Sequence, residues 1–266
     1  MNTRSILITG AGGSLGAAAV RAFLSRGYTV FAADIDVKNV PEGAVPVRMD
    51  VASAESVKAA GEEIGKSCEG LWAIIHLAGL YTMDSFVEIE EDALERMLEV
   101  NLMGVWRVNR ELLPLVRRGN GRIIITASEL APLDPLPFNG IYSVTKRALD
   151  GYAHSLAMEL NLLGVKVITV YPGAFGDGMT RGAIKAMDSM GEKTKLYPGV
   201  TERFRGIVAE NAGKPKPPEK LAEFLVRIAE KKRPRFRYFI NNSLKLRLFS
   251  ALPAGAQASL LKKLLK

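Results

Sequence analysis

The chain has 266 residues, of which 48% are hydrophobic and 24% charged, the balance of a folded globular protein rather than a disordered one. Its single cysteine, Cys68, excludes an internal disulfide framework and suits a reducing compartment. The sequence has no run of eighteen apolar residues that would predict a membrane span. A strand-like segment follows Met1 almost directly and leaves no room for a signal peptide, so we expect a cytoplasmic protein.

The net charge of +8 is unevenly distributed. Residues 214–266 hold 14 Lys and Arg against 3 Asp and Glu, whereas the rest of the chain holds 22 against 25. This asymmetry indicates either a surface that meets anions, such as acidic lipid or phosphate, or a solvated basic face that aids solubility.

Strand-like apolar runs alternate with helical patterns through most of the chain. In chain order the pattern predicts a strand at 5–9, a helix at 17–25, strands at 28–33 and 45–49, a helix at 54–64, a strand at 71–77, one or two helices within 89–116, a strand at 122–126, a helix at 142–163 and a strand at 165–170. This alternation predicts a single α/β domain: a doubly wound parallel sheet of the Rossmann type with helices on both faces.

The regular pattern stops after Pro172. Residues 174–218 contain many Gly and Pro residues, and we expect them to form an irregular substrate loop with short helical stretches. An amphipathic helix is predicted at 219–231. The catalytic domain is therefore assigned to residues 1–240, and residues 241–266 form a basic amphipathic extension without a place in the sheet.

A glycine-rich segment, residues 10–16, joins the first predicted strand to the first helix. Glycines allow a tight turn and a close approach to a pyrophosphate, and the helix N-terminus offers unpaired N–H groups. Asp34, at the end of the second strand, can accept hydrogen bonds from both ribose hydroxyls of adenosine and would repel a 2′-phosphate. These features predict NAD over NADP. We interpret Asp36 as a turn residue, while Asp50 and Val51 either lie near the adenine or end their strand as a cap.

Tyr142 and Lys146 lie four residues apart, so on a helix both side chains project from one face. A neighbouring cation favours the phenolate form of a tyrosine, which shifts its pKa toward neutral pH. Such a group can exchange a proton with a substrate oxygen, as the interconversion of an alcohol and a carbonyl requires. The same spacing also occurs on ordinary exposed helices.

With these segments in order, the sequence resembles the short-chain dehydrogenase/reductase family over residues 3 to about 240. The resemblance implies that Tyr142 is the catalytic acid/base, that Lys146 lowers its pKa and binds the nicotinamide ribose, and that Ser128 hydrogen-bonds the substrate oxygen. It also implies that Asn101 holds a water in a proton relay. The residues it assigns to the cofactor are Gly10, Gly13, Ser14, Leu15, Gly16, Asp34, Asp50, Val51, Ala78, Gly79, Tyr142, Lys146, Pro172 and Gly173.

Several positions depart from the family pattern. His76-Leu77 replaces the usual Asn-Asn before Ala78-Gly79, and we expect His76 to pack at a strand end beneath the cofactor. Asp177 stands where a Thr often binds the cofactor amide, with Thr180 the nearest replacement. The glycine spacing also resembles the sugar-nucleotide epimerase branch, so an NAD-dependent epimerase or dehydratase is an alternative. A non-enzymatic NAD(H)-sensing protein is a second one.

Other segments look similar to the retinol and hydroxysteroid dehydrogenase group, which implies a lipophilic secondary alcohol or ketone as substrate. The expected pocket wall, residues 129–133, Phe138 and 175–179, is largely apolar and agrees with this. The family commonly pairs subunits through helices such as 101–115 and 142–163, so we expect a homodimer or homotetramer. No nucleic-acid partner is expected. In the extension, one helical face carries Leu260, Leu261, Leu264 and Leu265, and this helix either contacts an anionic membrane surface or docks on protein.

Overall fold

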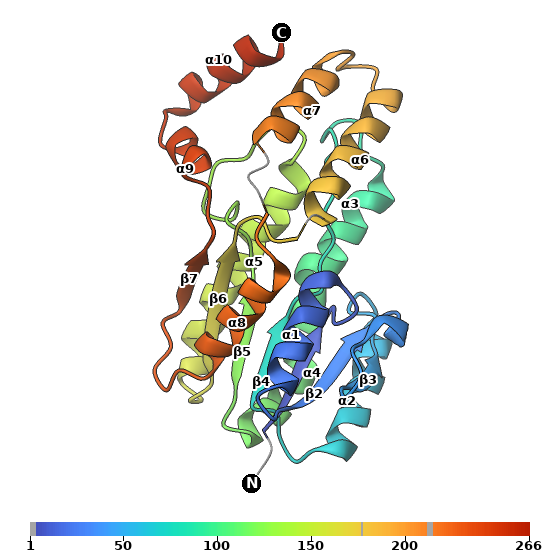
Figure 1. Ribbon diagram of the computed structural model, residues 1–266, viewed down its shortest axis with the longest axis vertical. Helices are drawn as coiled ribbons and strands as arrows, with labels where there is room; N and C mark the ends of the chain where they lie inside the picture. Colours follow the sequence, from blue (N-terminus) through green and yellow to red (C-terminus); the bar gives the residue numbers. More distant parts are fainter. Residues whose placement is uncertain (1–3, 177, 212–214) are drawn as a thin grey trace.

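A computed structural model describes residues 4–176, 178–211 and 215–266 (Figure 1). Within them, seven parallel strands form one sheet in the order β3-β2-β1-β4-β5-β6-β7. Their bounds are β1 Ser5–Thr9, β2 Thr29–Asp34, β3 Val45–Arg48, β4 Ala73–His76, β5 Arg122–Thr126, β6 Lys166–Pro172 and β7 Arg237–Ile240. The strand order reverses between β1 and β4, and ligands of such sheets bind at the carboxyl ends of the strands at this switch point. The predicted fold class is confirmed.

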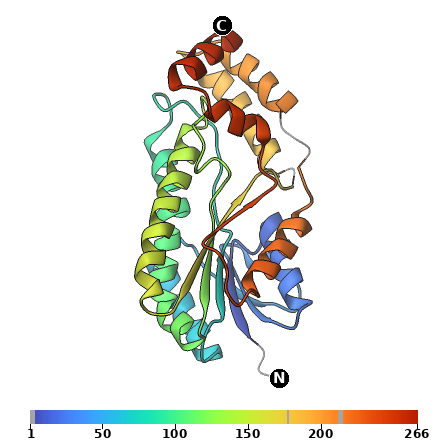
Figure 2. The same cartoon turned by 90° about the vertical axis from the view of Figure 1, so that its left-hand side faces the viewer.

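Helices cover both faces of the sheet (Figure 2). The helices are α1 Ser14–Leu24, α2 Ala54–Ser67, α3 Glu91–Leu98, α4 Gly104–Arg118, α5 Gly140–Asn161, α6 Gly178–Lys193, α7 Val200–Asn211, α8 Pro218–Ala229, α9 Leu244–Ser250 and α10 Ala254–Leu265. One face packs against α2, α4 and α5, and the other against α1 and α8. No helix of the described residues is long and apolar enough to cross a bilayer.

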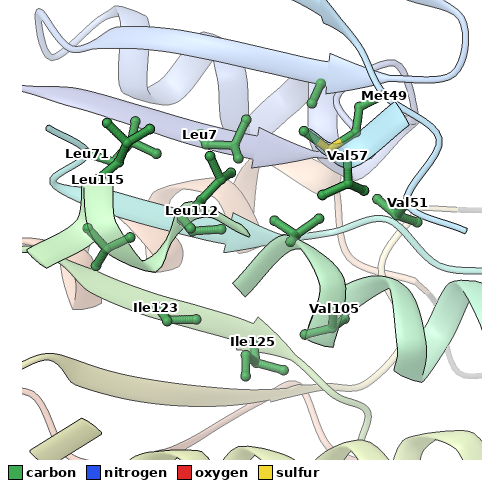
Figure 3. Close-up of a cluster of buried hydrophobic side chains, with 14 of the residues drawn as sticks. Leu7, Met49, Val51, Val57, Leu71, Val105, Leu112, Leu115, Ile123 and Ile125 are labelled. Carbon is green, nitrogen blue, oxygen red and sulfur yellow. The ribbon is translucent and has the colours of Figure 1, made fainter. Parts of the chain in front are cut away.

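The central strands β1, β4 and β5 are short runs rich in Ile that are buried on both faces, as parallel strands between two helix layers must be. The cluster on the α2, α4 and α5 side is drawn in Figure 3, where side chains of β1, β5 and α4 interdigitate between sheet and helix. Burial of this apolar surface is the main favourable contribution to folding and fixes the strand ends that carry the polar residues described below.

The structure differs from the sequence prediction after Pro172. Residues expected to be an irregular loop contain α6 and α7, and a seventh strand, β7, pairs with β6. These helices pack with α10 through a cluster that also includes Met83 from the loop after β4. We call α6, α7, α9 and α10 the cap; it lies at the carboxyl ends of the strands (Figures 1 and 2).

The extension 241–266 forms two helices, α9 and α10, and the four leucines expected on one helical face lie on α10. Leu265 is buried in the cap cluster, whereas Leu260 and Leu264 are exposed. The four leucines therefore do not share one environment, because the end of α10 packs against α7 through Leu265.

Candidate active site

The glycine-rich turn depends on the absence of side chains at two positions. Gly10 has φ +70°, and a Cβ there would lie 2.6 Å from the backbone N of Ala78. A Cβ on Gly16 would lie 2.0 Å from the carbonyl oxygen of Gly10. Gly13 precedes the first residue of α1, Ser14, and the first turn of α1 carries no acidic residue. The turn therefore presents an open helix N-terminus, which suits a phosphate group.

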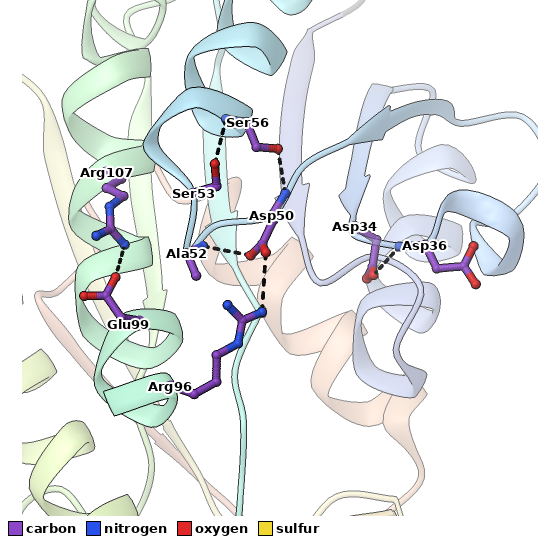
Figure 4. Close-up of polar contacts among 9 residues, drawn as sticks. All are labelled: Asp34, Asp36, Asp50, Ala52, Ser53, Ser56, Arg96, Glu99 and Arg107. Atoms are coloured by element: carbon purple, nitrogen blue, oxygen red, sulfur yellow. Dashed lines mark hydrogen bonds and ion pairs between the residues drawn. The ribbon is translucent and has the colours of Figure 1, made fainter. Parts of the chain in front are cut away.

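Asp34 ends β2 directly beside this turn. Its Oδ2 accepts a hydrogen bond of 2.9 Å from the N–H of Gly12. Its Oδ1 accepts one of 3.3 Å from the N–H of Asp36 (Figure 4). Asp36 itself accepts a bond of 3.0 Å from the N–H of Lys38 and is exposed, as a turn residue should be. Asp34 thus places a carboxylate at the strand end next to the predicted phosphate site.

Asp50 is engaged with the protein. Its Oδ1 accepts from the N–H of Ala52 at 2.9 Å, and its Oδ2 lies 3.4 Å from Arg96 (Figure 4). Val51 is buried against Gly104, where a Cβ would meet Val51 at 2.8 Å. These contacts fit a strand-end cap, and the contact of this pair with the adenine stays a prediction.

Tyr142 lies in the first turns of α5 and is buried among Met97, Ile141 and Tyr81. Burial raises the pKa of Tyr142 to about 12, and the neighbouring Ser128 side chain opposes the rise. The expected lowering of this pKa is thus not found, because burial outweighs the favourable interactions.

Lys146 follows one helical turn later and is also buried. Its Nζ donates a hydrogen bond of 3.1 Å to the carbonyl of Thr126 at the end of β5, and lies 5.6 Å from the centre of the Tyr142 ring. Burial lowers the pKa of Lys146 to about 8. The Thr126 hydroxyl is buried and has no hydrogen-bond partner among the described residues, whereas the Ser128 side chain acts on Tyr142. Of these two residues, Ser128 is therefore the one whose hydroxyl lies beside Tyr142.

Asn101 lies in a π-helical segment, Glu99–Met103, between α3 and α4. Its amide accepts from the N–H of Leu80 at 2.7 Å and donates to the Leu80 carbonyl at 2.9 Å and to Thr145 at 3.1 Å. This amide therefore ties the loop after β4 to α5, and π-helical turns are frequent at functional sites. The predicted relay through a water remains a prediction.

Gly79 connects these side chains. A Cβ on Gly79 would lie 3.3 Å from Asn101 Oδ1 and 3.8 Å from Lys146 Nζ. Ala78, the preceding residue, donates its N–H to the hydroxyl of Thr9 at 3.3 Å. The loop after β4 therefore joins the glycine-rich turn to the Tyr142 region.

Pro172 lies at the end of β6 and Gly173 follows it. Both residues lie next to the end of β7. Gly173 donates to the Ile240 carbonyl at 3.0 Å, and a Cβ on Gly173 would lie 2.0 Å from the Asn241 carbonyl oxygen. Asp177 and the side chain of Thr180 lie outside the described residues, so the contact with the cofactor amide stays a prediction.

His76 ends β4 and is buried. Its Nε2 is 2.8 Å from Asn109 Oδ1, and burial lowers the pKa of His76 to about 4. The ring is therefore neutral at physiological pH and packs inside the fold at the end of the strand, while its place beneath the cofactor stays a prediction.

Two side chains beside Tyr142 received no individual role from the sequence: Tyr81 was not singled out, and Glu129 was expected only as part of the pocket wall. Tyr81 packs edge-to-face on it, with ring centroids 4.7 Å apart. Glu129 follows Ser128, its carboxylate contributes to raising the pKa of Tyr142, and it accepts a hydrogen bond of 2.6 Å from the N–H of Ser243. Neither has a sequence signature, because each reaches Tyr142 only through folding.

A cavity of about 380 Å³ lies between the loop after β4 and α6. Its lining mixes apolar and charged side chains and differs from the expected wall: Thr82, Met83, Asp84, Glu88, Glu90, Ala186, Ser189, Met190, Lys193, Thr194 and Lys195. Glu88 accepts bonds from the Thr194 hydroxyl at 2.6 Å and from the N–H of Lys195 at 2.8 Å, and so anchors the turn between α6 and α7.

Comparison with known proteins gives consistent matches. The family model described as short chain dehydrogenase matches residues 4–188. Estradiol 17-beta-dehydrogenase 2 of Mus musculus is 28% identical over 80% of this chain and 57% of its own length, so the chain spans little more than half of that relative. A 3-ketodihydrosphingosine reductase of Bacteroides thetaiotaomicron is 27% identical over 89% of this chain and 87% of its own. The crystal structure of a short-chain dehydrogenase from Streptomyces avermitilis superposes with a TM-score of 0.78 at 22% identity, covering 99% of this chain and 95% of that one.

Proposed function

The chain belongs to the short-chain dehydrogenase family, and on that premise we propose that it interconverts an alcohol and a ketone by hydride transfer with NAD. The observation that carries the proposal is the grouping of three side chains: Ser128 acts on the buried hydroxyl of Tyr142, and Lys146 Nζ lies 5.6 Å from the centre of the Tyr142 ring. This group lies at the carboxyl ends of the strands, where the glycine-rich turn and Asp34 are also found.

NAD, when bound, accepts or supplies the hydride, and the protein positions the substrate and moves the proton. In the proposed mechanism, the Ser128 hydroxyl orients the substrate oxygen and Tyr142 exchanges a proton with it. Lys146 and Asn101 hold the surrounding backbone through Thr126 and Leu80. A phenol with a pKa of about 12 is protonated at neutral pH, which suits a proton donor in ketone reduction. The oxidation rate should therefore rise with pH, because the reverse step needs the phenolate.

The preference for NAD over NADP rests on Asp34. Its carboxylate adjoins the N–H of Gly12 and would face a 2′-phosphate at close range. Residues 11–14 of the turn contribute no Lys or Arg to bind that phosphate.

We assign the substrate to the lipophilic secondary alcohols and ketones. The cavity beside the loop after β4 supports this assignment, since Met83, Ala186 and Met190 contribute apolar side chains to its lining. Methionine side chains adapt to apolar ligands. The names of the relatives, an estradiol dehydrogenase and a 3-ketodihydrosphingosine reductase, agree with this class.

The protein is proposed to form a homo-oligomer through α4 and α5. These helices expose Trp106 and Met158 to solvent, and such apolar side chains favour association of subunits. Light scattering after size-exclusion chromatography measures the assembly.

The substitution Tyr142→Phe tests the catalytic proposal. It should lower kcat by about 10² to 10⁴-fold, the usual contribution of a positioned acid or base, while NAD still binds. Tyr152→Phe is the matched control, because Tyr152 also lies on α5, has a pKa of about 12 and loses one hydrogen bond, that from Asn109 at 3.0 Å.

Activity is followed by NADH absorbance over steroid, retinoid, bile-acid and hydroxyacyl substrates. Retention of activity by Tyr142→Phe, or equal loss in Tyr152→Phe, would end the assignment. Turnover of a sugar nucleotide without net change in NADH would instead support the epimerase alternative. Binding of NAD(H) without turnover of any substrate would support the sensor.

A further inference from the structure

The C-terminal helices expose a set of leucines. Along the 26 residues after β7, five leucines are at least 40% exposed, and the most exposed of them reaches 66%. They are Leu244 and Leu248 on α9, Leu252 between the helices, and Leu260 and Leu264 on α10. Each helical pair is four residues apart and so shares one face of its helix. We call these five residues the leucine surface.

The helix α10, which carries part of the leucine surface, is held to the rest of the protein by specific contacts. Arg203 Nε donates to the Leu265 carbonyl at 3.0 Å, and the side chain of Leu265 is buried in the cap cluster. Gln257 donates to Asp134 at 2.8 Å. The leucines therefore stay exposed although both ends of α10 are fixed to the body.

Cations accompany the leucines. Residues 241–266 contain five basic side chains and no Asp or Glu. The basic residues are all exposed: Lys245, Arg247, Lys262, Lys263 and Lys266. Exposed leucines interspersed with Lys and Arg form the pattern of amphipathic helices that lie in the interface of an anionic membrane.

We propose that α9 and α10 dock the protein onto an anionic lipid bilayer, with the leucine surface in the acyl boundary and the lysines at lipid phosphates. A second copy of the chain fits less well, because an isologous interface would press five cations against the same five. Nucleic acid fits less well because exposed leucines gain nothing from a phosphate backbone.

The location of the surface connects it to the site. Ser243, which caps α9, donates its N–H to Glu129 at 2.6 Å, and Glu129 follows Ser128. The helices belong to the cap at the carboxyl ends of the strands (Figure 2). Docking thus places the substrate end of the molecule at the bilayer, so that a lipophilic substrate reaches it from the membrane. This last step rests on the proposed function, whereas docking itself does not.

Co-sedimentation of the full chain with phosphatidylcholine vesicles, with and without phosphatidylserine, tests the proposal. The wild type should pellet with the phosphatidylserine vesicles and be released by salt. Lys262→Gln with Lys263→Gln should weaken binding roughly 25-fold, at about fivefold for each lysine. Leu248→Ser with Leu264→Ser should also weaken it, and Leu162→Ser, at a still more exposed leucine directly after α5, should not.

Failure of the wild type to bind anionic vesicles would overturn the proposal, as would equal binding by the lysine and leucine variants. A lipid-free dimer that the leucine substitutions dissociate would assign the surface to a second copy instead. Dehydrogenase activity on a water-soluble ketone without vesicles is measured in parallel. Its loss in Tyr142→Phe and its retention in the tail variants separate the two proposals.

Discussion

Replacing Asp34 with Asn should remove most of the discrimination between NAD and NADP while it preserves the glycine-rich turn. Asp34 Oδ2 accepts a hydrogen bond of 2.9 Å from the N–H of Gly12, and the side-chain oxygen of Asn can accept the same bond. The substitution therefore removes the charge and keeps the shape.

The size of the effect follows from the charge of the 2′-phosphate. NADP carries this group on the ribose oxygen that Asp34 is proposed to hold, about 4 Å from the carboxylate, where two unit charges near a protein surface repel by about 4 kcal/mol. Asp34 is only partly buried, and salt screens exposed charges. We therefore expect about 2 to 3 kcal/mol, or roughly 30- to 150-fold in the ratio of the two Kd values. Arg48 lies opposite Asp34 in the register of β2 and β3, which further favours a phosphate once the carboxylate is gone.

Isothermal titration calorimetry of each variant with NAD and NADP measures this ratio. Asp36→Asn is the control, because Asp36 lies two residues along the chain and its carboxylate binds the N–H of Lys38 rather than the turn. It should leave the ratio unchanged. A wild type that binds both cofactors equally, or an equal change in Asp36→Asn, would refute the reasoning.

Two further substitutions test the energetics of the site. Lys146→Met should abolish turnover yet stabilise the protein at pH 7, because burial lowers the pKa of Lys146 from 10.5 to about 8. This shift destabilises the folded wild type by about 3 kcal/mol, which Lys146→Met removes. The variant also loses the hydrogen bond to the Thr126 carbonyl, worth about 1 kcal/mol, and this loss reduces its net gain in stability. The wild type bears this full cost below pH 8 and loses it as the pH approaches 10.5, where the lysine becomes neutral in the unfolded chain as well. Urea unfolding should therefore show a higher free energy of unfolding for Lys146→Met than for the wild type at pH 7, and a smaller difference at pH 10. A variant less stable than the wild type at pH 7 would contradict this. Gly16→Ala should destabilise by about 1 to 3 kcal/mol and weaken NAD binding, since its Cβ would meet the Gly10 carbonyl at 2.0 Å. Gly65→Ala is the control, because no atom of the described residues lies within 4 Å of a Cβ added at Gly65. Thermal melts should show no loss of stability in this variant. Similar losses of stability in both variants would argue against a steric cause.

Local sequence patterns predicted the elements that depend on local chemistry. The apolar runs at 5–9 and 122–126 are strands with those bounds, because short runs of Ile and Leu are typical of parallel strands buried between two helix layers. Glycines at positions 10 and 16 are required by contacts of 2.6 and 2.0 Å, and their spacing is visible in the sequence. The family and the fold were therefore accessible without coordinates.

Elements held by distant contacts were missed. The strand β7 has four residues, and only its pairing with β6 makes it a strand. The helices α6 and α7 have many breakers nearby and are held by the cap cluster and by Glu88. The leucine face expected on α10 is divided because Leu265 turns toward α7.

The sequence by itself determined which chemical groups the protein has: a phenol and an ammonium four residues apart, a hydroxyl at Ser128 and a carboxylate at Asp34. Only the tertiary structure decided how the phenol and the ammonium titrate and what each of the four groups contacts. The pKa of Tyr142 stands at about 12, not below its ordinary value, since burial among side chains such as Met97 and Tyr81 from other parts of the chain desolvates it. Residue type and spacing are local properties, whereas desolvation is set by every element that packs around a group.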